Sequence, residues 1–292
     1  MIPFPNISPE IFSITIGETE LALRWYALSY IAGFVAAGFI MRFYINRTKL
    51  WPYQTPPLEL HQAESIITYL IVGVIFGGRV GYVLFYNFDF YLANPIDVIR
   101  IWDGGMSFHG GFLGVIFAVI FYCRFHGIPL LSCADIIAIS TPPGLLFGRV
   151  ANFINAELWG RPTNVTWGVV FPGERAQDCP GVIGACARHP SQLYEAGLEG
   201  LLLFSILITL SFFGMLKRAG FLTGIFFIGY GSARYFVEFF RVADPQFITS
   251  ENPLGYAYKL GEIGISMGQV LSLPMIVIGI IFVFISHARE KV

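Results

Sequence analysis

The sequence predicts an all-α integral membrane protein with about seven transmembrane helices and an extracytoplasmic head region built from loops. The first observation is composition: 55% of the 292 residues are hydrophobic, 13% are charged, and the mean hydropathy is +0.66, which is too apolar for an ordinary soluble domain. The second is that mostly apolar runs of about 20 residues, the length that crosses a bilayer, recur along the chain. The formal net charge of −1 gives no electrostatic reason to expect nucleic acid as a partner.

Seven such runs are expected to span the membrane. They cover residues 23–43, 65–86, 108–124, 132–153, 193–214, 221–240 and 267–286. The fourth run holds Pro142, Pro143 and Gly144 in its middle, which predicts a kink whose freed backbone groups are satisfied by neighbouring helices or water. Glycines 77, 78, 81, 104, 105, 110, 111, 114 and 148 predict close helix packing or close approach of a lipid. Without a repeat or a linker, residues 1–292 are expected to form a single polytopic membrane domain.

The distribution of basic residues predicts the topology. If the N-terminus lies outside, one face of the membrane collects Arg42, Arg47, Lys49, Arg124, Lys217, Arg218, Arg289 and Lys291. By the positive-inside rule this face is the cytoplasm, so the C-terminus is cytoplasmic. The opposite side then carries the acidic N-terminus and two long loops, a head loop near 154–192 and another at 241–266. The N-terminus lacks the basic region of a signal peptide, so we expect it to be mature sequence.

Charged residues inside the apolar runs need a reason, because an arginine at the bilayer centre costs about 3 kcal/mol even on lenient scales. Arg79, Arg149 and Arg234 are such residues. The alternative is that these arginines reach the headgroups along their apolar stems, and for Arg161 and Arg241 we favour that or a structural ion pair. Arg234 and Glu238 stand at i and i+4 and can pair, with Arg241 continuing the row.

Arg149, Asn152 and Asn155 recur every three residues, so a helix sets them on one broad face. A guanidinium is permanently charged and its donor fork matches phosphate oxygens, so Arg149 and Arg234 would suit a phospholipid headgroup. His109 lies at the outer end of the third run and, with a reference pKa of about 6.5, is a candidate base. The alternative is a histidine with an ordinary structural hydrogen bond.

The cysteines and histidines predict neither a metal site nor a cofactor. Cys123 and Cys133 fall at cytoplasmic ends of helices, and no histidine has a second ligand at helical spacing. Cys179 and Cys186 lie in the head loop, where an oxidising compartment would allow a disulfide; two unpaired small residues are the alternative.

The block GRVANFINAELWGRPT at 148–163 resembles the signature of the prolipoprotein diacylglyceryl transferase family. The chain is also similar to that family in five further segments, in the expected order: RWYALSYIAGF at 24–34, GGRVGYVLFYN at 77–87, WDGGMSFHGGFLG at 102–114, HPSQLYEA at 189–196 and GYGSARYFVEFFR at 229–241. Ala151 stands where the family often has glycine, which exchanges one small residue for another.

The resemblance implies a bacterial inner-membrane enzyme that works on the extracytoplasmic side. Such an enzyme moves the sn-1,2-diacylglyceryl group of phosphatidylglycerol to the lipobox cysteine thiol of a preprolipoprotein signal peptide, forming a thioether and releasing glycerol phosphate. Arg149 and Arg234 would hold the phosphate, and His109 would assist the thiol. The substrate-binding residues that the resemblance implies are Tyr26, Asn152, Glu157, Gly160, His189 and Tyr230. Arg79, inside an apolar run, and Asn155, three residues after Asn152, are two further candidates for substrate binding. Glu157 is equally well read as a structural partner of Arg149 or Arg161.

Two other function classes compete with this interpretation. A transporter or flippase of an anionic lipid or solute also uses intramembrane arginines and broken helices, and inverted repeats would favour it. A non-catalytic scaffold is disfavoured on the ground that it has no need for interior arginines without counter-charges.

Overall fold

The structure is a computed structural model that describes residues 1–292 except 17–18, 180, 244, 250, 261–262 and 290–292. Lys291, used above for the topology, lies outside the described residues. The chain forms two compact units, one of Met1–Ala37 with Ala138–Val292 and one of Gly38–Ile137, and each is described by itself. Helices α1 (Trp25–Ile45) and α5 (Leu130–Ser140) both run across the boundary, and a single domain over 1–292 stays a prediction.

Among the residues that the structure describes, six helical segments are long and apolar enough to cross a membrane, which confirms the predicted membrane fold. They are Trp25–Ile45, Leu60–Tyr86, His109–His126, Leu130–Ile154, Ser191–Phe212 and Met267–His287. The seventh predicted span corresponds to α10 (Phe221–Val237), whose 17 residues stand at the lower end of the usual spanning length. Each predicted range overlaps one of these seven segments.

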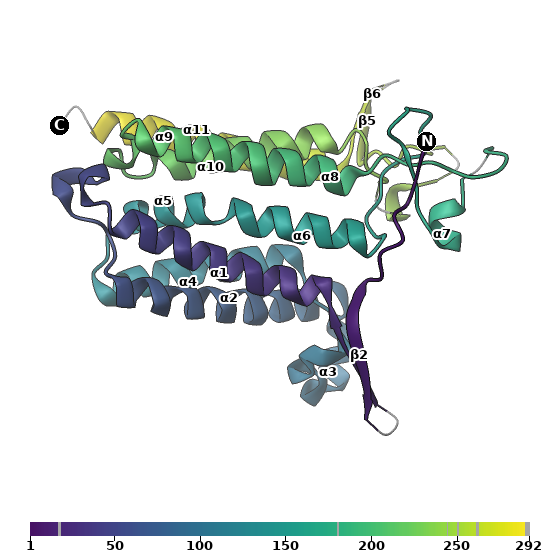
Figure 1. Ribbon diagram of the computed structural model, residues 1–292, viewed down its shortest axis with the longest axis horizontal. Helices are drawn as coiled ribbons and strands as arrows, with labels where there is room; N and C mark the ends of the chain where they lie inside the picture. The colour runs from purple at the N-terminus through teal and green to yellow at the C-terminus, as the bar shows by residue number, and fades with distance from the viewer. Residues whose placement is uncertain (17–18, 180, 244, 250, 261–262, 290–292) are drawn as a thin grey trace. The chain divides into compact units, whose positions relative to one another are not determined.

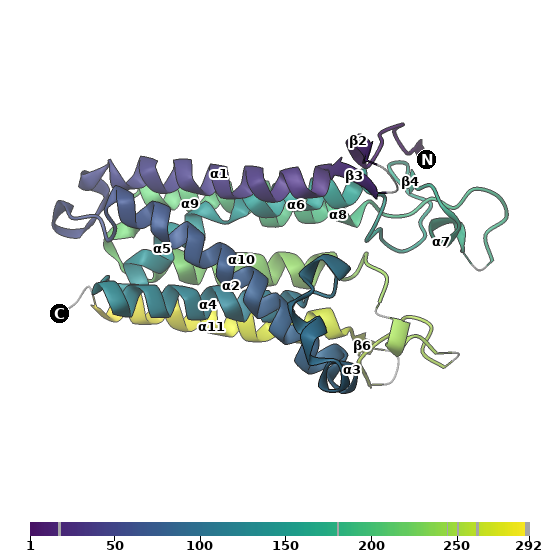
Figure 2. The same cartoon turned by 90° about the horizontal axis from the view of Figure 1, so that it is seen from below.

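In the unit Gly38–Ile137, helices α2 (Leu60–Tyr86) and α4 (Phe108–His126) pack side by side, as Figure 2 shows. A Cβ added at Gly77 would lie 2.8 Å from the Cα of Gly114, and one at Gly81 would lie 2.7 Å from the Cα of Gly110. The two backbones therefore touch, which only glycine permits. This confirms helix packing for Gly77, Gly81, Gly110 and Gly114, whereas a Cβ added at Gly104 or Gly148 would meet nothing within 4 Å. The hydroxyl of Ser107 begins α4 by accepting a hydrogen bond from the amide of Gly110, 3.2 Å away.

The other unit contains the remaining spans. The fourth is divided into α5 and α6 (Pro142–Ile154), and the break falls at Thr141, just before the two prolines, as their missing amide hydrogens require. The fifth consists of α8 (Ser191–Glu195), a π-helical turn at Ala196–Leu202 and α9 (Leu203–Phe212). Helix α11 (Met267–Arg289) packs along α10 (Figure 1), and Ser266 and Gln269 cap its start reciprocally.

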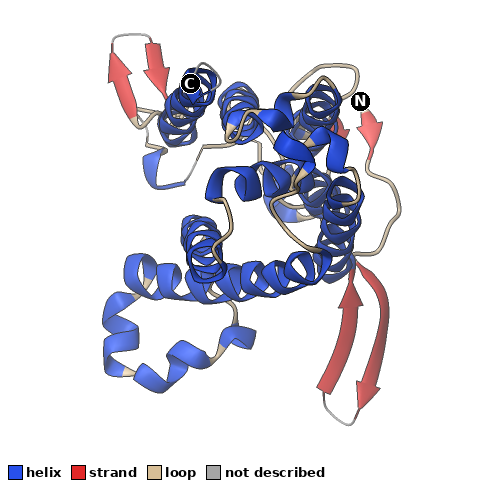
Figure 3. Ribbon diagram, turned by 90° about the vertical axis from the view of Figure 1, so that its left-hand side faces the viewer, coloured by secondary structure: helices blue, strands red, loops and turns tan. Residues whose placement is uncertain are grey.

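In the described part of the chain, three two-stranded sheets, which the sequence did not predict, lie outside the spans (Figure 3). Strand β1 (Ile2–Pro3) pairs in parallel with β4 (Val169–Val170), β2 (Glu10–Ile16) forms an antiparallel hairpin with β3 (Thr19–Arg24), and β5 (Tyr258–Leu260) pairs with β6 (Ile263–Ile265). The residues between the fourth and fifth spans also include α7 (Glu174–Gln177). Between the second and third spans lie α3 (Phe88–Ala93) and the 3-10 helices Pro95–Ile99 and Ile101–Asp103.

The kind of side chain that is buried differs between the membrane spans and the head. On α11 the polar Ser272 and Ser286 are buried while Phe284 is exposed, the arrangement expected of a helix that faces lipid. The head has a small apolar core of its own, in which Val169 and Phe171 pack with neighbouring aromatic rings. A disulfide joins Cys179 to Cys186 beside this core. The two cysteines are therefore bonded to each other, and the alternative of two unpaired small residues is wrong.

Candidate active site

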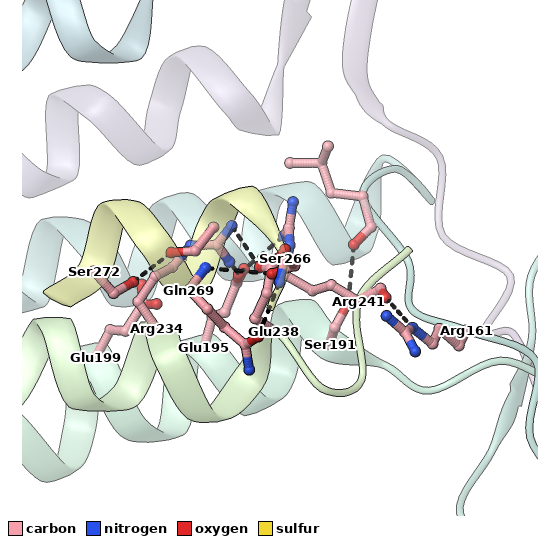
Figure 4. A network of polar contacts seen from close by, with 12 residues as sticks. Arg161, Ser191, Glu195, Glu199, Arg234, Glu238, Arg241, Ser266, Gln269 and Ser272 are labelled. Carbon is pink, nitrogen blue, oxygen red and sulfur yellow. Dashed lines mark hydrogen bonds and ion pairs between the residues drawn. The ribbon is translucent and has the colours of Figure 1, made fainter. Parts of the chain in front are cut away.

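Ion pairs join three arginines and three glutamates of the fourth, fifth and sixth spans and the turn after the sixth. Figure 4 shows Arg234, Arg241 and the three glutamates of this cluster. Glu195, at the end of α8, is its centre. Its carboxylate lies 3.2 Å from Arg149 Nε, 2.6 Å from Arg234 Nη1 and 2.9 Å from Arg241 Nη1. One buried carboxylate thus bridges three guanidinium groups that come from α6, α10 and the turn after α10.

Two further glutamates complete the cluster. Glu199 in the π-helical turn lies 3.5 Å from Arg149 Nη2, and Glu238 lies 3.0 Å from Arg234 Nη2 and 3.4 Å from Arg241 Nε. The formal charges cancel, three against three. The side chains of Glu195 and Glu199 are fully buried, whereas the three arginine side chains keep 17–20% of their surface exposed. The arginines therefore form the open edge of the cluster.

Glu238 is also packed against the start of α11. A Cβ added at Gly268 would lie 2.7 Å from both carboxylate oxygens of Glu238, so only glycine lets the helix approach so closely. A helix N-terminus carries partial positive charge and favours a nearby anion. Glu238 is thus held from two sides.

This geometry decides several expectations from the sequence. The row of Arg234, Glu238 and Arg241 is confirmed, and Arg241 forms structural ion pairs as favoured above. Glu195 and Glu199 were not predicted from the sequence as members of the site. Because they supply counter-charges to Arg149, Arg234 and Arg241, the expectation that the interior arginines lack such charges is wrong, and it no longer disfavours a scaffold.

Two tyrosines border the cluster. Tyr230 of α10 is buried, stacks on Phe226 with 6.0 Å between ring centroids, and interacts electrostatically with Glu199 and Arg149. Tyr26 of α1 is exposed, and its hydroxyl lies 3.1 Å from that of Tyr30. The Tyr26 hydroxyl also interacts electrostatically with Arg149.

Glu157 lies on a strained turn, three residues after the end of α6 at Ile154. The residues on either side of it, Ala156 and Leu158, have φ of 52° and 56°, a left-handed conformation that costs a side-chain-bearing residue about 1–2 kcal/mol. Side chains of α8 hold the turn: Gln192 Nε2 donates to the carbonyl of Glu157 at 2.5 Å, and Ser191 Oγ donates to that of Leu158 at 3.0 Å.

The carboxylate of Glu157 is paired with amides. Asn152 Nδ2 donates to Oε1 at 2.8 Å, and Asn155 Nδ2 donates to the same oxygen at 3.3 Å. Of the two roles left open for Glu157, the structural partnership is thus made with Asn152 and Asn155, because Arg149 faces Glu195 and Glu199, and Arg161 donates from Nε to the carbonyl of Arg241 at 2.6 Å. The helical face predicted for Arg149, Asn152 and Asn155 is present, with Asn155 as the C-cap of α6.

Gly160 and His189 lie where the head loop meets the sixth span. The amide of Gly160 donates to the carbonyl of His189 at 2.9 Å, and a Cβ at Gly160 would lie 2.9 Å from the Cβ of His189, so no larger residue fits. His189 Nδ1 lies 3.1 Å from the hydroxyl of Tyr194, which accepts a hydrogen bond from Trp167 Nε1 at 2.7 Å. That hydroxyl is then free to donate to Nδ1, leaving the proton of the neutral ring on Nε2. Burial lowers the pKa of His189.

Arg188 was not singled out by the sequence, yet it organises the head loop. Its side chain is buried, donates from Nε to the carbonyl of Ala176 at 2.6 Å and from Nη2 to that of Asp178 at 2.8 Å. Its guanidinium also stacks 4.0 Å above the ring of Trp159. No sequence pattern marks it, because all three partners are distant along the chain or are backbone atoms.

Arg79 and His109 belong to the other unit. Arg79 is buried, and its five N–H groups donate to five backbone carbonyls, those of Asp97, Val98, Arg100, Gly104 and Gly105, at 2.5–3.2 Å. Its donors are therefore committed to holding the 97–105 segment. His109 is exposed in the first turn of α4. In the described part of the chain, no three His, Cys, Asp or Glu side chains are grouped to hold a metal ion.

Comparison with known proteins places these residues in a family context. The model of the prolipoprotein diacylglyceryl transferase family matches residues 11–285. The chain is 55% identical over 289 residues to the phosphatidylglycerol–prolipoprotein diacylglyceryl transferase of Ruegeria pomeroyi, covering 99% of this chain and 98% of the relative. Proteins of the same name are 57% identical in Roseobacter denitrificans, covering 96% and 95%, and 46% identical in Methylocella silvestris, covering 100% and 98%.

Proposed function

Because the chain belongs to the prolipoprotein diacylglyceryl transferase family, we propose that it transfers the diacylglyceryl group of phosphatidylglycerol to a cysteine thiol of a prolipoprotein. The observation that carries this conclusion is the family match over residues 11–285, supported by relatives of that activity that align with nearly the whole chain. The enzyme is a transferase embedded in a membrane by several apolar helices.

In the reaction, the cysteine sulfur forms a bond to the terminal carbon of the diacylglyceryl group. The bond from that carbon to the phosphate oxygen breaks, and glycerol phosphate leaves with the electron pair. The thiol proton goes to a base. Since a free thiol has a pKa of about 8.5, only a few per cent is ionised at neutral pH, so a group that takes the proton would raise the rate.

Arg149 and Arg234 would bind the phosphate and stabilise the charge that develops on it as it leaves. The partial exposure of these arginine side chains supports this role, since Glu195 and Glu199, which neutralise them, are fully buried. The contacts of Arg149 with Glu195 and Glu199 use Nε and Nη2, which leaves Nη1 for a phosphate oxygen. Glu195 would act as a positioning residue that fixes the angle between the two guanidinium groups.

His109 would accept the thiol proton or hold the thiol by a hydrogen bond, and its exposure supports access of a substrate. The site of the lipid headgroup around Arg149 would be lined by Tyr26, Asn152, Asn155, Glu157 and Tyr230. Gly160 and His189 would support the substrate site indirectly, because they join the head loop to the sixth span. Arg79 would support it by holding the segment 97–105, which precedes His109.

We place the enzyme in the bacterial inner membrane with its active site on the extracytoplasmic side, and the acceptor is the lipobox cysteine of a signal peptide. The distribution of basic residues supports this topology. The disulfide between Cys179 and Cys186 also supports it, because such bonds persist in oxidising compartments.

The experiment uses purified protein, labelled phosphatidylglycerol and a lipobox peptide, with the thioether product measured by mass spectrometry. Arg149→Lys and Arg234→Lys keep the charge but lose the donor fork, so each should lower transfer about ten- to a hundredfold, the equivalent of a hydrogen bond to a charged group. Arg161→Lys is the milder control, because its guanidinium contacts backbone carbonyls.

His109→Gln should lower turnover more than lipid binding, because its role is at the thiol. Wild-type turnover of this variant across neutral pH would remove His109 from the mechanism. Absence of the thioether with the native protein would reject the transferase and leave lipid or solute transport as the function to assay.

A further inference from the structure

Two buried amide oxygens, one at the start of the strained turn and one on α8 beside it, make no hydrogen bond within the described part of the chain: Asn155 Oδ1 and Gln192 Oε1. Their orientation is fixed by chemistry. Each amide nitrogen donates to Glu157, that of Asn155 to the carboxylate and that of Gln192 to the main-chain carbonyl. Carboxylates and carbonyls only accept, so the nitrogens must face Glu157 and the oxygens must face away from it.

An unpaired buried acceptor is unfavourable, and native structures retain few of them without a use. Here two lie at one turn, beside the carboxylate of Glu157, so the turn presents three groups that accept hydrogen bonds. Such a surface would repel a phosphate and would bind hydroxyl groups. Asn152, which pairs with Glu157, follows Arg149 by three residues on α6, so the acceptors begin one helical turn from the proposed phosphate site.

We propose that Asn155, Glu157 and Gln192 form a subsite for the hydroxyl groups of the glycerol headgroup, and that this subsite selects a polyol headgroup over headgroups without hydroxyls. The subsite rests on the proposed function, since it assumes that the phosphate of the same lipid is held at Arg149. The neutral amide oxygens match neutral hydroxyl donors, and a site built for hydroxyls rejects an analogue that lacks them because its buried acceptors stay unpaired.

The strain of the turn supports this assignment. Ala156 and Leu158 are held in left-handed backbone conformations by Gln192 and Ser191, both fully buried. Strained backbone persists where the surroundings impose it, and it is concentrated at ligand-binding sites. The turn therefore presents its acceptors in a fixed arrangement before the lipid arrives.

The test compares two donor lipids on the same enzyme preparation: phosphatidylglycerol, and phosphatidylpropanol, which keeps the phosphate and the leaving-group bond but has no headgroup hydroxyl. The measured quantity is the ratio of kcat/KM for the two lipids, which does not depend on how much of the preparation is folded. The native protein should prefer phosphatidylglycerol at least about tenfold. Gln192→Met loses the donor to the turn as well as the proposed acceptor, so kcat/KM should fall for both lipids, but further for phosphatidylglycerol. The ratio should therefore fall about three- to tenfold, the range expected for one neutral hydrogen bond.

Asn155→Leu should do the same, and it serves as the second variant if Gln192→Met does not fold. The matched control is Ser191→Ala, which loosens the same turn without removing a proposed lipid-facing acceptor, and should lower kcat/KM for both lipids alike. An equal fall for both lipids in Gln192→Met and Asn155→Leu would overturn the subsite and leave these residues as supports of the turn.

Equal use of both lipids by the native protein, or a preference for phosphatidylethanolamine over phosphatidylglycerol, would also overturn the subsite while leaving the transferase function intact. A native protein that yields no thioether from any donor would instead overturn the proposed function. The two failures are therefore distinguishable in one set of reactions.

Discussion

Replacing Glu195 by glutamine removes the central charge of the cluster while keeping the size of the side chain. Three arginines then face two carboxylates, Glu199 and Glu238, and the cluster carries a formal charge of +1. The new amide oxygen can accept from some of the arginines, but the amide nitrogen only donates and cannot replace the other carboxylate oxygen, so the three contacts at 2.6, 2.9 and 3.2 Å are only partly kept.

The magnitude follows from those contacts. At a charge separation of about 4 Å and an effective dielectric constant of 20, each pair attracts by about 4 kcal/mol. Most of the sum offsets the cost of removing the ions from water, and breaking a buried pair by removing one partner destabilises a protein by about 3–5 kcal/mol. For a chain of this size such a loss lowers the thermal midpoint by on the order of 10 °C.

The assay is the thermal midpoint of the purified protein in detergent, followed by tryptophan fluorescence, with transfer activity measured on the same sample. Glu64→Gln is the matched control, since Glu64 is an exposed glutamate on α2, and it should leave the midpoint unchanged. Arg241→Lys should also lower the midpoint, because one ammonium cannot reproduce contacts to both Glu195 and Glu238. A Glu195→Gln midpoint within about 2 °C of the parent, equivalent to under 1 kcal/mol, would refute an ion-paired Glu195.

Three further outcomes are expected. Cys179→Ser with Cys186→Ser should lower stability by about 2 kcal/mol through the lost loop constraint, while transfer largely survives, and unreduced peptides of the native protein should contain the pair linked. Burial lowers the pKa of His189 from 6.5, so the unfolded chain binds that proton more readily; the thermal midpoint should fall as pH drops below 6.5, and His189→Gln should remove this part of the pH dependence. Gly77→Val should cost about 1–3 kcal/mol or more through collision with α4, measured against Gly148→Ala, whose added Cβ meets nothing within 4 Å.

The membrane spans were predictable because lipid imposes a single strong requirement, a run of about 20 apolar residues, and each run can be found without knowing its neighbours. Local spacing was equally informative. It predicted the row from Arg234 to Arg241, the shared face of Arg149 and Asn152, and the break at Pro142, all of which depend on residues within a few positions of one another.

Pairing between spans was not predictable in the same way. Glu195 and Glu199 contact arginines about 40 to 50 residues away, and no local pattern names such partners. A signal did exist, since two glutamates at i and i+4 in the fifth apolar run oppose the interior arginines in sign. The hairpin of β2 and β3 was missed for another reason: its alternating EIFSITI segment was interpreted only through its acidic residues.

The sharing of the cluster among three spans has a consequence for biogenesis. Each of these helices enters the bilayer carrying charge that its own segment does not neutralise. When only the fourth and fifth spans are present, Arg149 meets two glutamates and an excess negative charge remains. The sixth span and the turn that follows bring two arginines and one glutamate, which restore neutrality. A nascent chain that stops before Arg234 therefore keeps one carboxylate without a counter-charge inside the membrane, and only the arrival of the sixth span and the turn after it removes that excess charge.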